Sequence, residues 1–202
     1  MKRLHRHDLY CWSAFQPRLN VDFNGFAWVR DDGNVLIDPL PMSTHDQEHL
    51  ASLGGASWIV LTNSDHVRGA AEAAARWGAR LAGPAAEKDD FPIICERWLA
   101  AGDELYPGLV TLELDGSKTP GELALLLEET TLIAGDLVRS HRAGTLMLLR
   151  PEQGLRDPKR AAASVKRLLD HPRIDAVLVG DGWCVFRDGH AALSELVTAL
   201  GR

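Results

Sequence analysis

The stretch WIVLTNSDH, residues 58–66, decides the fold of this chain. Its first four residues form a short continuous apolar run, which predicts a buried strand. The polar residues 62–66 predict a loop, and an Ala-rich helix is expected over residues 67–77, closed by Gly78. A strand, a polar loop and a helix of small residues in this order indicate a layered α/β protein.

Three later loops lie beside similar apolar runs. Residues 117–121 read Ser-Lys-Thr-Pro-Gly, residues 135–136 read Gly-Asp, and residues 180–182 read Gly-Asp-Gly. The runs beside them predict buried strands over residues 109–114, 123–127, 131–134 and 176–179. The chain therefore offers four polar loops at the ends of expected strands.

The remaining segments supply a hairpin and three more helices. Residues 23–30 and 34–38 predict the two strands of a hairpin, because Gly33 between them accepts the positive φ of a tight turn. Ser43 is the expected N-cap of a helix that ends at Leu53. The other expected elements are a strand over residues 79–82, a helix over 159–169 that follows Pro158, and a helix over 190–200 capped by Asp188.

In order and spacing, these loops resemble those of the metallo-β-lactamase superfamily from about Asn24 to the C-terminus. The family's loops read Thr-His-x-His-x-Asp-His, Gly-His-Thr-x-Gly, Gly-Asp and Gly-His-Gly. The Thr-Asn-x-Asp-His of residues 62–66 is most similar to a small bacterial branch of metal-dependent hydrolases with a degenerate metal site. The resemblance implies a four-layer αββα sandwich, formed as one domain over residues 1–202.

The first metal loop has lost its histidines. Asn63 and Asp65 stand at the family's first two histidine positions, Val67 at its aspartate and Arg68 at its third histidine. His66 occupies a spacer position, so its side chain is expected to point away from the metal centre.

The other loops have lost theirs as well. Lys118 stands at the second loop's histidine, and Asp181 at the last one, whereas the bridging aspartate is retained as Asp136. The donors that remain all offer oxygen: Asn63, Asp65, Asp136 and Asp181. Oxygen ligands suit Mn²⁺ or Mg²⁺ better than a pair of zinc ions, so the expected cofactor is one weakly held divalent metal, or none.

Charge counting offers a metal-free alternative. Asp65, Asp136 and Asp181 contribute three negative charges, and Arg68 and Lys118 contribute two positive ones. Because buried carboxylates require a counter-charge, the two cations are hypothesised to replace the two metal ions. For Asp65, Asp136 and Asp181, a buried ion-pair network without chemistry is favoured over metal ligation.

Three further side chains stay open to two interpretations. Lys118 is either a catalytic amine or the ion-pair partner of Asp136 or Asp181, and the ion pair is favoured. Arg139 either binds a ligand carboxylate or phosphate, or is solvated. Trp183, with Trp28 and Phe26, either walls an apolar ligand pocket or packs in the core.

Composition excludes several classes of function. The chain has 202 residues, a net charge of −6 and no cluster of Lys and Arg, which argues against nucleic acid as a partner. Its apolar runs are shorter than the roughly 20 residues that span a bilayer, and its charged start lacks the apolar region of a signal peptide. Three widely spaced cysteines fit reduced thiols, so a cytoplasmic protein is expected.

Two functions follow as hypotheses. The first is a hydrolase of a small ester, thioester or lactone-like substrate, with a single metal held by Asp65, Asp136 and Asp181 and assisted by Asn63. The second is a metal-free protein that binds a small anion through Arg68, Lys118 and Arg139. A purely structural role, with homo-oligomers, stays open.

Overall fold

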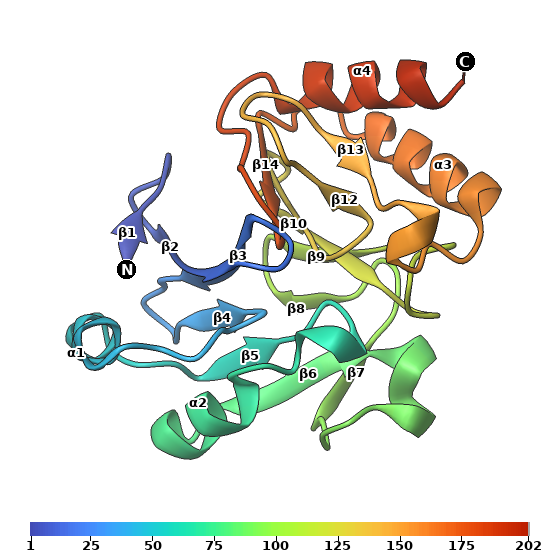
Figure 1. Cartoon of the computed structure of the whole chain (residues 1–202). Coiled ribbons are helices and arrows are strands. Elements are labelled where there is room, and N and C mark those ends of the chain that lie inside the picture. The colour runs from blue at the N-terminus through green and yellow to red at the C-terminus, as the bar shows by residue number, and fades with distance from the viewer. Residues whose placement is uncertain (202) are drawn as a thin grey trace.

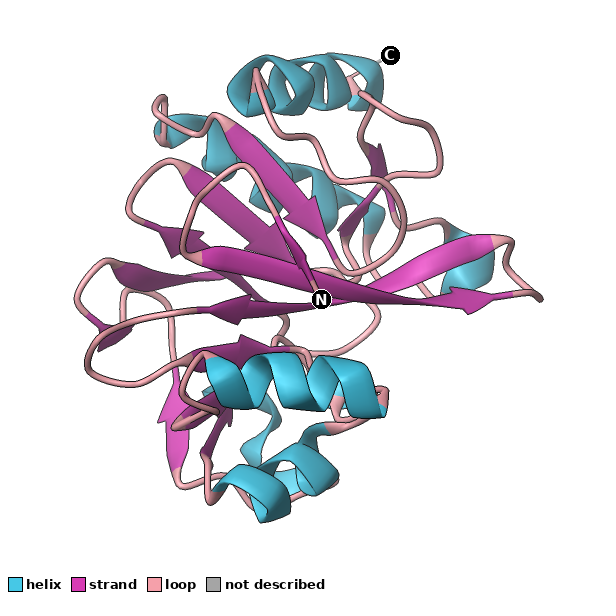
Figure 2. Cartoon of the chain, turned by 90° about the vertical axis from the view of Figure 1, so that its left-hand side faces the viewer, coloured by secondary structure: helices cyan, strands magenta, loops and turns pink. Residues whose placement is uncertain are grey.

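Two β-sheets lie face to face at the centre of the molecule, with helices on their outer faces (Figure 1). The computed structural model describes residues 1–201. Seen from the side, helices lie above and below the stacked strands, which gives the four layers of an αββα sandwich (Figure 2). The expected fold class is therefore confirmed.

The first sheet has seven strands in the order in which they occur along the chain. Their bounds are β1 Lys2–Arg3, β2 Leu9–Gln16, β3 Val21–Trp28, β4 Val35–Ile37, β5 Trp58–Val60, β6 Arg80–Pro84 and β7 Arg97–Leu99. Neighbours from β1 to β4 run antiparallel, and neighbours from β4 to β7 run parallel. The predicted hairpin is present, since Phe26 pairs with Ile37 and Trp28 with Val35.

The second sheet has five strands in the order β14-β11-β10-β9-β8. Their bounds are β8 Glu104–Tyr106, β9 Leu109–Glu113, β10 Leu123–Leu127, β11 Thr131–Ala134 and β14 Ala176–Val179. A two-stranded ribbon, β12 Val138–Arg139 with β13 Met147–Leu148, lies beside it. Every residue of β10 and β11 is buried, which explains why both segments read as continuous apolar runs in the sequence.

The α-helices are α1 Thr44–Ser52, α2 Ala70–Trp77, α3 Pro158–Arg167 and α4 Gly189–Leu200. The short 3₁₀ helices are η1 Ser64–His66, η2 Ala85–Asp90, η3 Pro151–Gln153 and η4 Leu168–Asp170. The Ser43 hydroxyl accepts a hydrogen bond from the Asp46 amide, so the predicted N-cap is confirmed. Asp188 precedes α4, but its side chain makes no capping hydrogen bond, so that expectation was wrong.

Three apolar layers hold the sandwich together. Phe26, Trp28 and Leu125 belong to the layer between the two sheets. A second layer joins the first sheet to α1 and α2, and a third joins the second sheet to α3 and α4. Burial of each large apolar side chain contributes about 1.5–3 kcal/mol to the free energy of unfolding. These layers fix the strand ends, and the four polar loops project from those ends.

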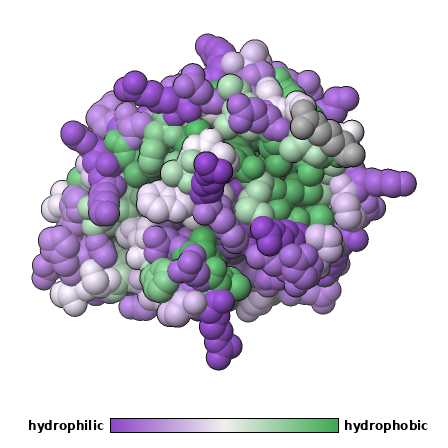
Figure 3. Space-filling model, turned by 45° about the horizontal axis from the view of Figure 1, so that its top comes forward, coloured by the Kyte–Doolittle hydropathy of each residue, from purple (hydrophilic) through white to green (hydrophobic). Residues whose placement is uncertain are grey.

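On the face shown in Figure 3, charged and polar side chains surround separate apolar patches. Within residues 1–201, none of the helices has the length and apolar character needed to cross a membrane.

Candidate metal and ligand site

The loop after β5 turns two consecutive side chains in opposite directions. The Asn63 side-chain oxygen accepts a hydrogen bond of 3.0 Å from the Asp65 amide and caps η1. Within this tight turn the Asp65 side chain is 42% exposed, whereas His66 is completely buried. The expectation that His66 points away from the site was therefore wrong. Residues 64–66 form a 3₁₀ turn, and α2 begins only at Ala70. This turn directs the side chain of His66 inward.

His66 is held by the carboxylate at the end of β4. Its Nδ1 atom lies 2.7 Å from Oδ2 of Asp38, and the Thr62 hydroxyl donates a hydrogen bond of 2.6 Å to the same oxygen. Burial alone would lower the pKa of His66, but the charge of Asp38, aided by Asp136, outweighs it and raises this pKa to about 10. Without a bound ion, His66 is therefore a cation at neutral pH.

Asp136 and Asp181 are joined by one guanidinium group. Arg139 lies 3.0 Å from Oδ1 of Asp136 and 3.1 Å from Oδ2 of Asp181, and all three side chains are buried. Burial would raise the pKa of Asp136, but His66, Arg139 and Lys118 together hold it well below its usual range. Burial raises the pKa of Asp181, although Arg139 opposes this. The open question about Arg139 is thus resolved: it is a buried counter-charge.

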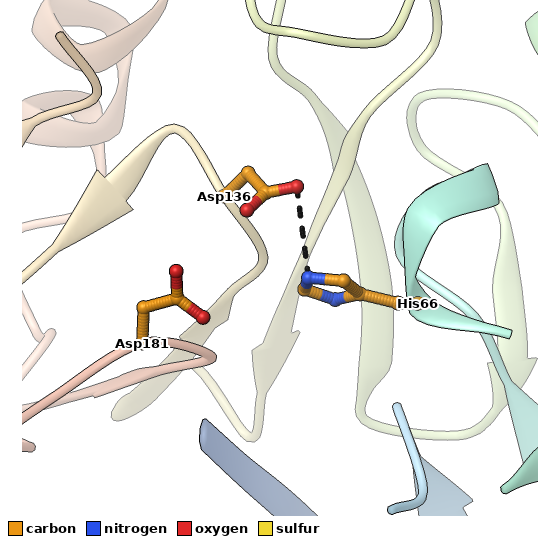
Figure 4. A group of neighbouring side chains, drawn as sticks. All are labelled: His66, Asp136 and Asp181. Atoms are coloured by element: carbon orange, nitrogen blue, oxygen red, sulfur yellow. Dashed lines mark ion pairs between the residues drawn. The ribbon is translucent and has the colours of Figure 1, made fainter. Parts of the chain in front are cut away.

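The remaining donor atoms face one another. His66 Nε2 lies 3.6 Å from Oδ2 of Asp136, which is ion-pair range but too long for a hydrogen bond. Within residues 1–201, His66 Nε2 and Asp181 Oδ1 are buried and have no hydrogen-bond partner. One ligand atom from each of His66, Asp136 and Asp181 lies within 4.8 Å of the others. Figure 4 shows the three side chains converging from three separate loops.

Lys118 pairs with Asp65 rather than with Asp136 or Asp181, which corrects the expected ion pair. Each of these two side chains is 42% exposed. Burial lowers the pKa of Lys118, but the hydrogen bond with Asp65 outweighs it, and this pKa lies above its ordinary value. Lys118 is therefore a cation at the mouth of the site, which disfavours the catalytic-amine interpretation.

Arg68 lies against the far side of Asp181. Its Nη2 atom is 3.8 Å from Oδ1 of Asp181, and its guanidinium carbon is 4.6 Å from the centre of the Phe23 ring. Its Nη1 atom is buried and has no partner within the described residues. Arg68 therefore keeps one donor free for a ligand.

Of the other predicted side chains, Asn63 lies in the site and Trp183 does not. Asn63 is fully buried, and its amide nitrogen lies 3.3 Å from Oδ2 of Asp136, so it does reach the site. Trp183 does not: it is 62% exposed and lies outside the cavity that contains Asp136. Trp28 and Phe26, its expected companions, are core residues with 1% exposure each. Of the two alternatives, packing in the core is therefore confirmed for Trp28 and Phe26, whereas Trp183 lies on the surface.

A cavity of about 490 Å³ opens over the cluster. Its wall includes the charged side chains just described except Asp38, together with Leu19, Phe23, Glu152 and Gln153. This volume lies in the range of sites for small molecules.

Glu122 is a site residue that the sequence analysis missed. It is fully buried, its Oε1 atom accepts a hydrogen bond of 2.8 Å from the Leu137 amide, and its Oε2 atom accepts one from the Ser117 hydroxyl. Burial, and then the charge of Asp136, raise the pKa of Glu122 to about 8. A charged residue directly before the apolar run of β10 was the signal that could have found it.

Comparison with known proteins identifies the family. A sequence profile of the metallo-β-lactamase superfamily matches residues 1–200. The chain belongs to the metallo-β-lactamase superfamily. It is 29% identical to a hydroxyacylglutathione hydrolase of Acidiphilium cryptum (strain JF-5) over 136 residues, which are 64% of this chain and 56% of that protein. The chain therefore matches only about half the length of this curated relative.

Solved structures agree on the fold of this superfamily member. A metallo-β-lactamase from Pontibacter korlensis has a TM-score of 0.76 at 18% identity, with 98% of this chain and 96% of that chain covered. The metallo-β-lactamase FIM-1 from Pseudomonas aeruginosa, solved in a mono-zinc form, has a TM-score of 0.68 at 18% identity, with 95% and 90% covered.

The superfamily implies metal, and the side chains present decide how much metal fits. The charge of the cavity wall favours one ion over two, because Arg68 and Lys118 line the same cavity as the three possible ligands. One ion fits the cluster, because one imidazole nitrogen and two carboxylate oxygens lie within 4.8 Å of one another. Asp38 and Arg139 orient this set from behind, as outer partners do in metal sites. The expected oxygen donors did not include His66, which the structure brings together with Asp136 and Asp181 as one possible metal site.

Proposed function

We propose that this chain is a hydrolase of a small ester, thioester or lactone-like substrate, and that it works with a single divalent ion held by His66, Asp136 and Asp181. The observation that carries the proposal is the group of His66, Asp136 and Asp181, which offer one possible ligand atom each within 4.8 Å of one another. His66 Nε2 and Asp181 Oδ1 are buried and make no hydrogen bond, and their ion-pair contacts are long, at 3.6 Å and 3.8 Å. A buried polar atom without a hydrogen bond costs about 1–3 kcal/mol, which supports an ion as the partner of this group.

The donor set bears on which ion is bound. An imidazole nitrogen moves the preference away from Mg²⁺ and towards Mn²⁺, Fe²⁺ or Zn²⁺. An ion at this position supplies Lewis-acid polarisation of a substrate carbonyl and an acidified water. The mono-zinc relative and the relative named as a hydrolase support this proposal.

The protein's own side chains position the substrate. Arg68 lines the cavity and keeps one buried Nη1 donor without a hydrogen bond, and Lys118 offers a half-exposed cation at the mouth. Asp136 and Asp181 cannot attract an anion themselves, but Arg139 and His66 neutralise them. A substrate that carries a carboxylate or phosphate next to its reactive carbonyl therefore suits this cavity.

Turnover tests the proposal directly. Protein loaded with Mn²⁺ or Zn²⁺ is expected to hydrolyse p-nitrophenyl acetate or a short-chain acyl thioester, and Asp136→Asn is expected to lower kcat/KM by about 100-fold or more. Glu48→Gln, an exposed change on α1, is the matched control and should keep the wild-type rate. Equal rates in wild type and Asp136→Asn would contradict the proposal.

A metal-free anion-binding protein is the second candidate, and the free Nη1 donor of Arg68 favours it. In that case inorganic phosphate or a small dicarboxylate should raise the Tm of the metal-free protein without turnover. Arg68→Met should remove this rise in Tm.

A further inference from the structure

Large exposed apolar side chains gather beside the candidate site. Residues 1–201 expose six such side chains, of which Phe15, Trp183 and Phe186 line one groove of about 500 Å³. They are 60%, 62% and 41% exposed, respectively. Single exposed apolar residues are common, but several around one concave surface indicate a binding site.

Two polar side chains that line the groove are already satisfied. The Ser13 hydroxyl donates a hydrogen bond of 2.7 Å to Asn24, and the Asn24 amide donates to the carbonyls of Val179 and Gly182 at 2.9 Å. Burial raises the pKa of the Cys184 thiol to about 12, so it stays neutral. The three aromatic side chains therefore stay available to an apolar group, beside the polar side chains of Lys2, Asn20, Asp22 and His141 that also line the groove.

The groove and the reaction cavity share a wall. Three pairs of consecutive residues have one member in each: Leu19 and Asn20, Phe23 and Asp22, Asp181 and Gly182. Phe23 also forms a β-bridge with Asp181, and Figure 1 shows the loop after β14 running beside β3. The groove and the reaction cavity therefore lie on either side of one wall, formed by β3 and the loop after β14.

We infer that the groove binds the apolar acyl or aromatic arm of the substrate whose reactive carbonyl lies at the His66–Asp136–Asp181 cluster. This inference rests on the proposed function and narrows it to esters or thioesters with an extended apolar acyl group. A concave groove of this volume suits such an arm better than a protein partner, which usually meets a flatter and larger surface.

Decanoate is the probe, because it binds without being hydrolysed and its affinity is measurable by calorimetry in the full chain. Each buried CH₂ contributes about 0.8 kcal/mol, so decanoate should bind at least about 10-fold more tightly than butyrate. Trp183→Ala should weaken decanoate about 10-fold. Ile94→Ala, which removes a side chain that is 89% exposed outside the groove, should leave the affinity unchanged.

The two proposals fail separately in this experiment. Asp136→Asn, which tests the hydrolase, should bind decanoate as the wild type does, since Asp136 lies outside the groove. Equal affinities for decanoate and butyrate, or no effect of Trp183→Ala, would overturn the acyl groove even if turnover is found. If the wild type binds no decanoate but forms a dimer, and Trp183→Ala dissociates this dimer, the groove binds a second copy of the chain. That result would also overturn the acyl-binding proposal.

Discussion

Asp65 and His66 are neighbours in the sequence, yet they belong to two different regions of the site. Asp65 lies at the mouth with Lys118, where water screens the pair. His66 lies inside with Asp136, Asp181 and Arg139, where almost no water reaches. The same kinds of charge therefore differ in their effect on stability. The exposed ion pair at the mouth contributes little, whereas each buried charge of the inner group requires a counter-charge from a partner or an ion.

The largest expected effect falls on the inner region. Arg139→Met leaves the buried carboxylates of Asp136 and Asp181 without their shared partner, so the free energy of unfolding should fall by about 3–5 kcal/mol. Urea denaturation measures this. Arg142→Met, an exposed change three residues on, is the control. A loss below about 1 kcal/mol would show that the inner region is not held by this guanidinium.

The next effect concerns the residue behind His66. Asp38→Asn keeps a side chain that tolerates the left-handed backbone at this position, where φ is 47°. It removes the charge that orients His66, and affinity for Mn²⁺ should fall by about 10- to 100-fold. Calorimetric titration checks this, and an unchanged Kd would mean that Asp38 serves the fold alone.

A pH effect should follow from Glu122, whose pKa rises from 4.5 to about 8 in the folded state. Between these two pH values the folded chain keeps a proton on Glu122 that the unfolded chain has lost. The contribution of Glu122 to the free energy of unfolding is therefore fully present below about pH 4.5. It falls as the pH rises towards 8, by up to about 1.4 kcal/mol per pH unit. Glu122→Gln, which cannot ionise, should flatten the dependence of Tm on pH across this window. An identical pH dependence in both proteins would contradict the burial argument.

The smallest effect is expected at the mouth. Lys118→Met breaks an ion pair whose members are both 42% exposed, so the free energy of unfolding should change by less than about 1 kcal/mol. This reverses the sequence-based expectation that Lys118 replaces a metal charge inside the protein. A change in Tm as large as that of Arg139→Met would restore that expectation and erase the distinction between the two regions.

The sequence predicted the strands, helices and polar loops because these depend on local patterns, whereas the four layers were expected from the resemblance of the loops to a known family. Apolar runs such as those of β10 and β11 mark buried strands, and Asp136 and Asp181 follow strand ends directly. The direction of His66 depends on one tight turn capped by Asn63, which spacing alone does not show. The contacts of Arg139 with Asp181 and of Glu122 with Leu137 could not be predicted either, since they join separate loops that only the packed sheets bring together.

Mn²⁺ binding, compared in His66→Gln and Asp65→Asn, tests the central claim most directly. Electron paramagnetic resonance counts free and bound Mn²⁺ without any need for turnover. The single-ion site predicts about one bound ion in the wild type and in Asp65→Asn, and a loss of affinity of at least about 10-fold in His66→Gln. An ion that is lost with Asp65→Asn and retained with His66→Gln, or no bound ion in any of the three proteins, would contradict it.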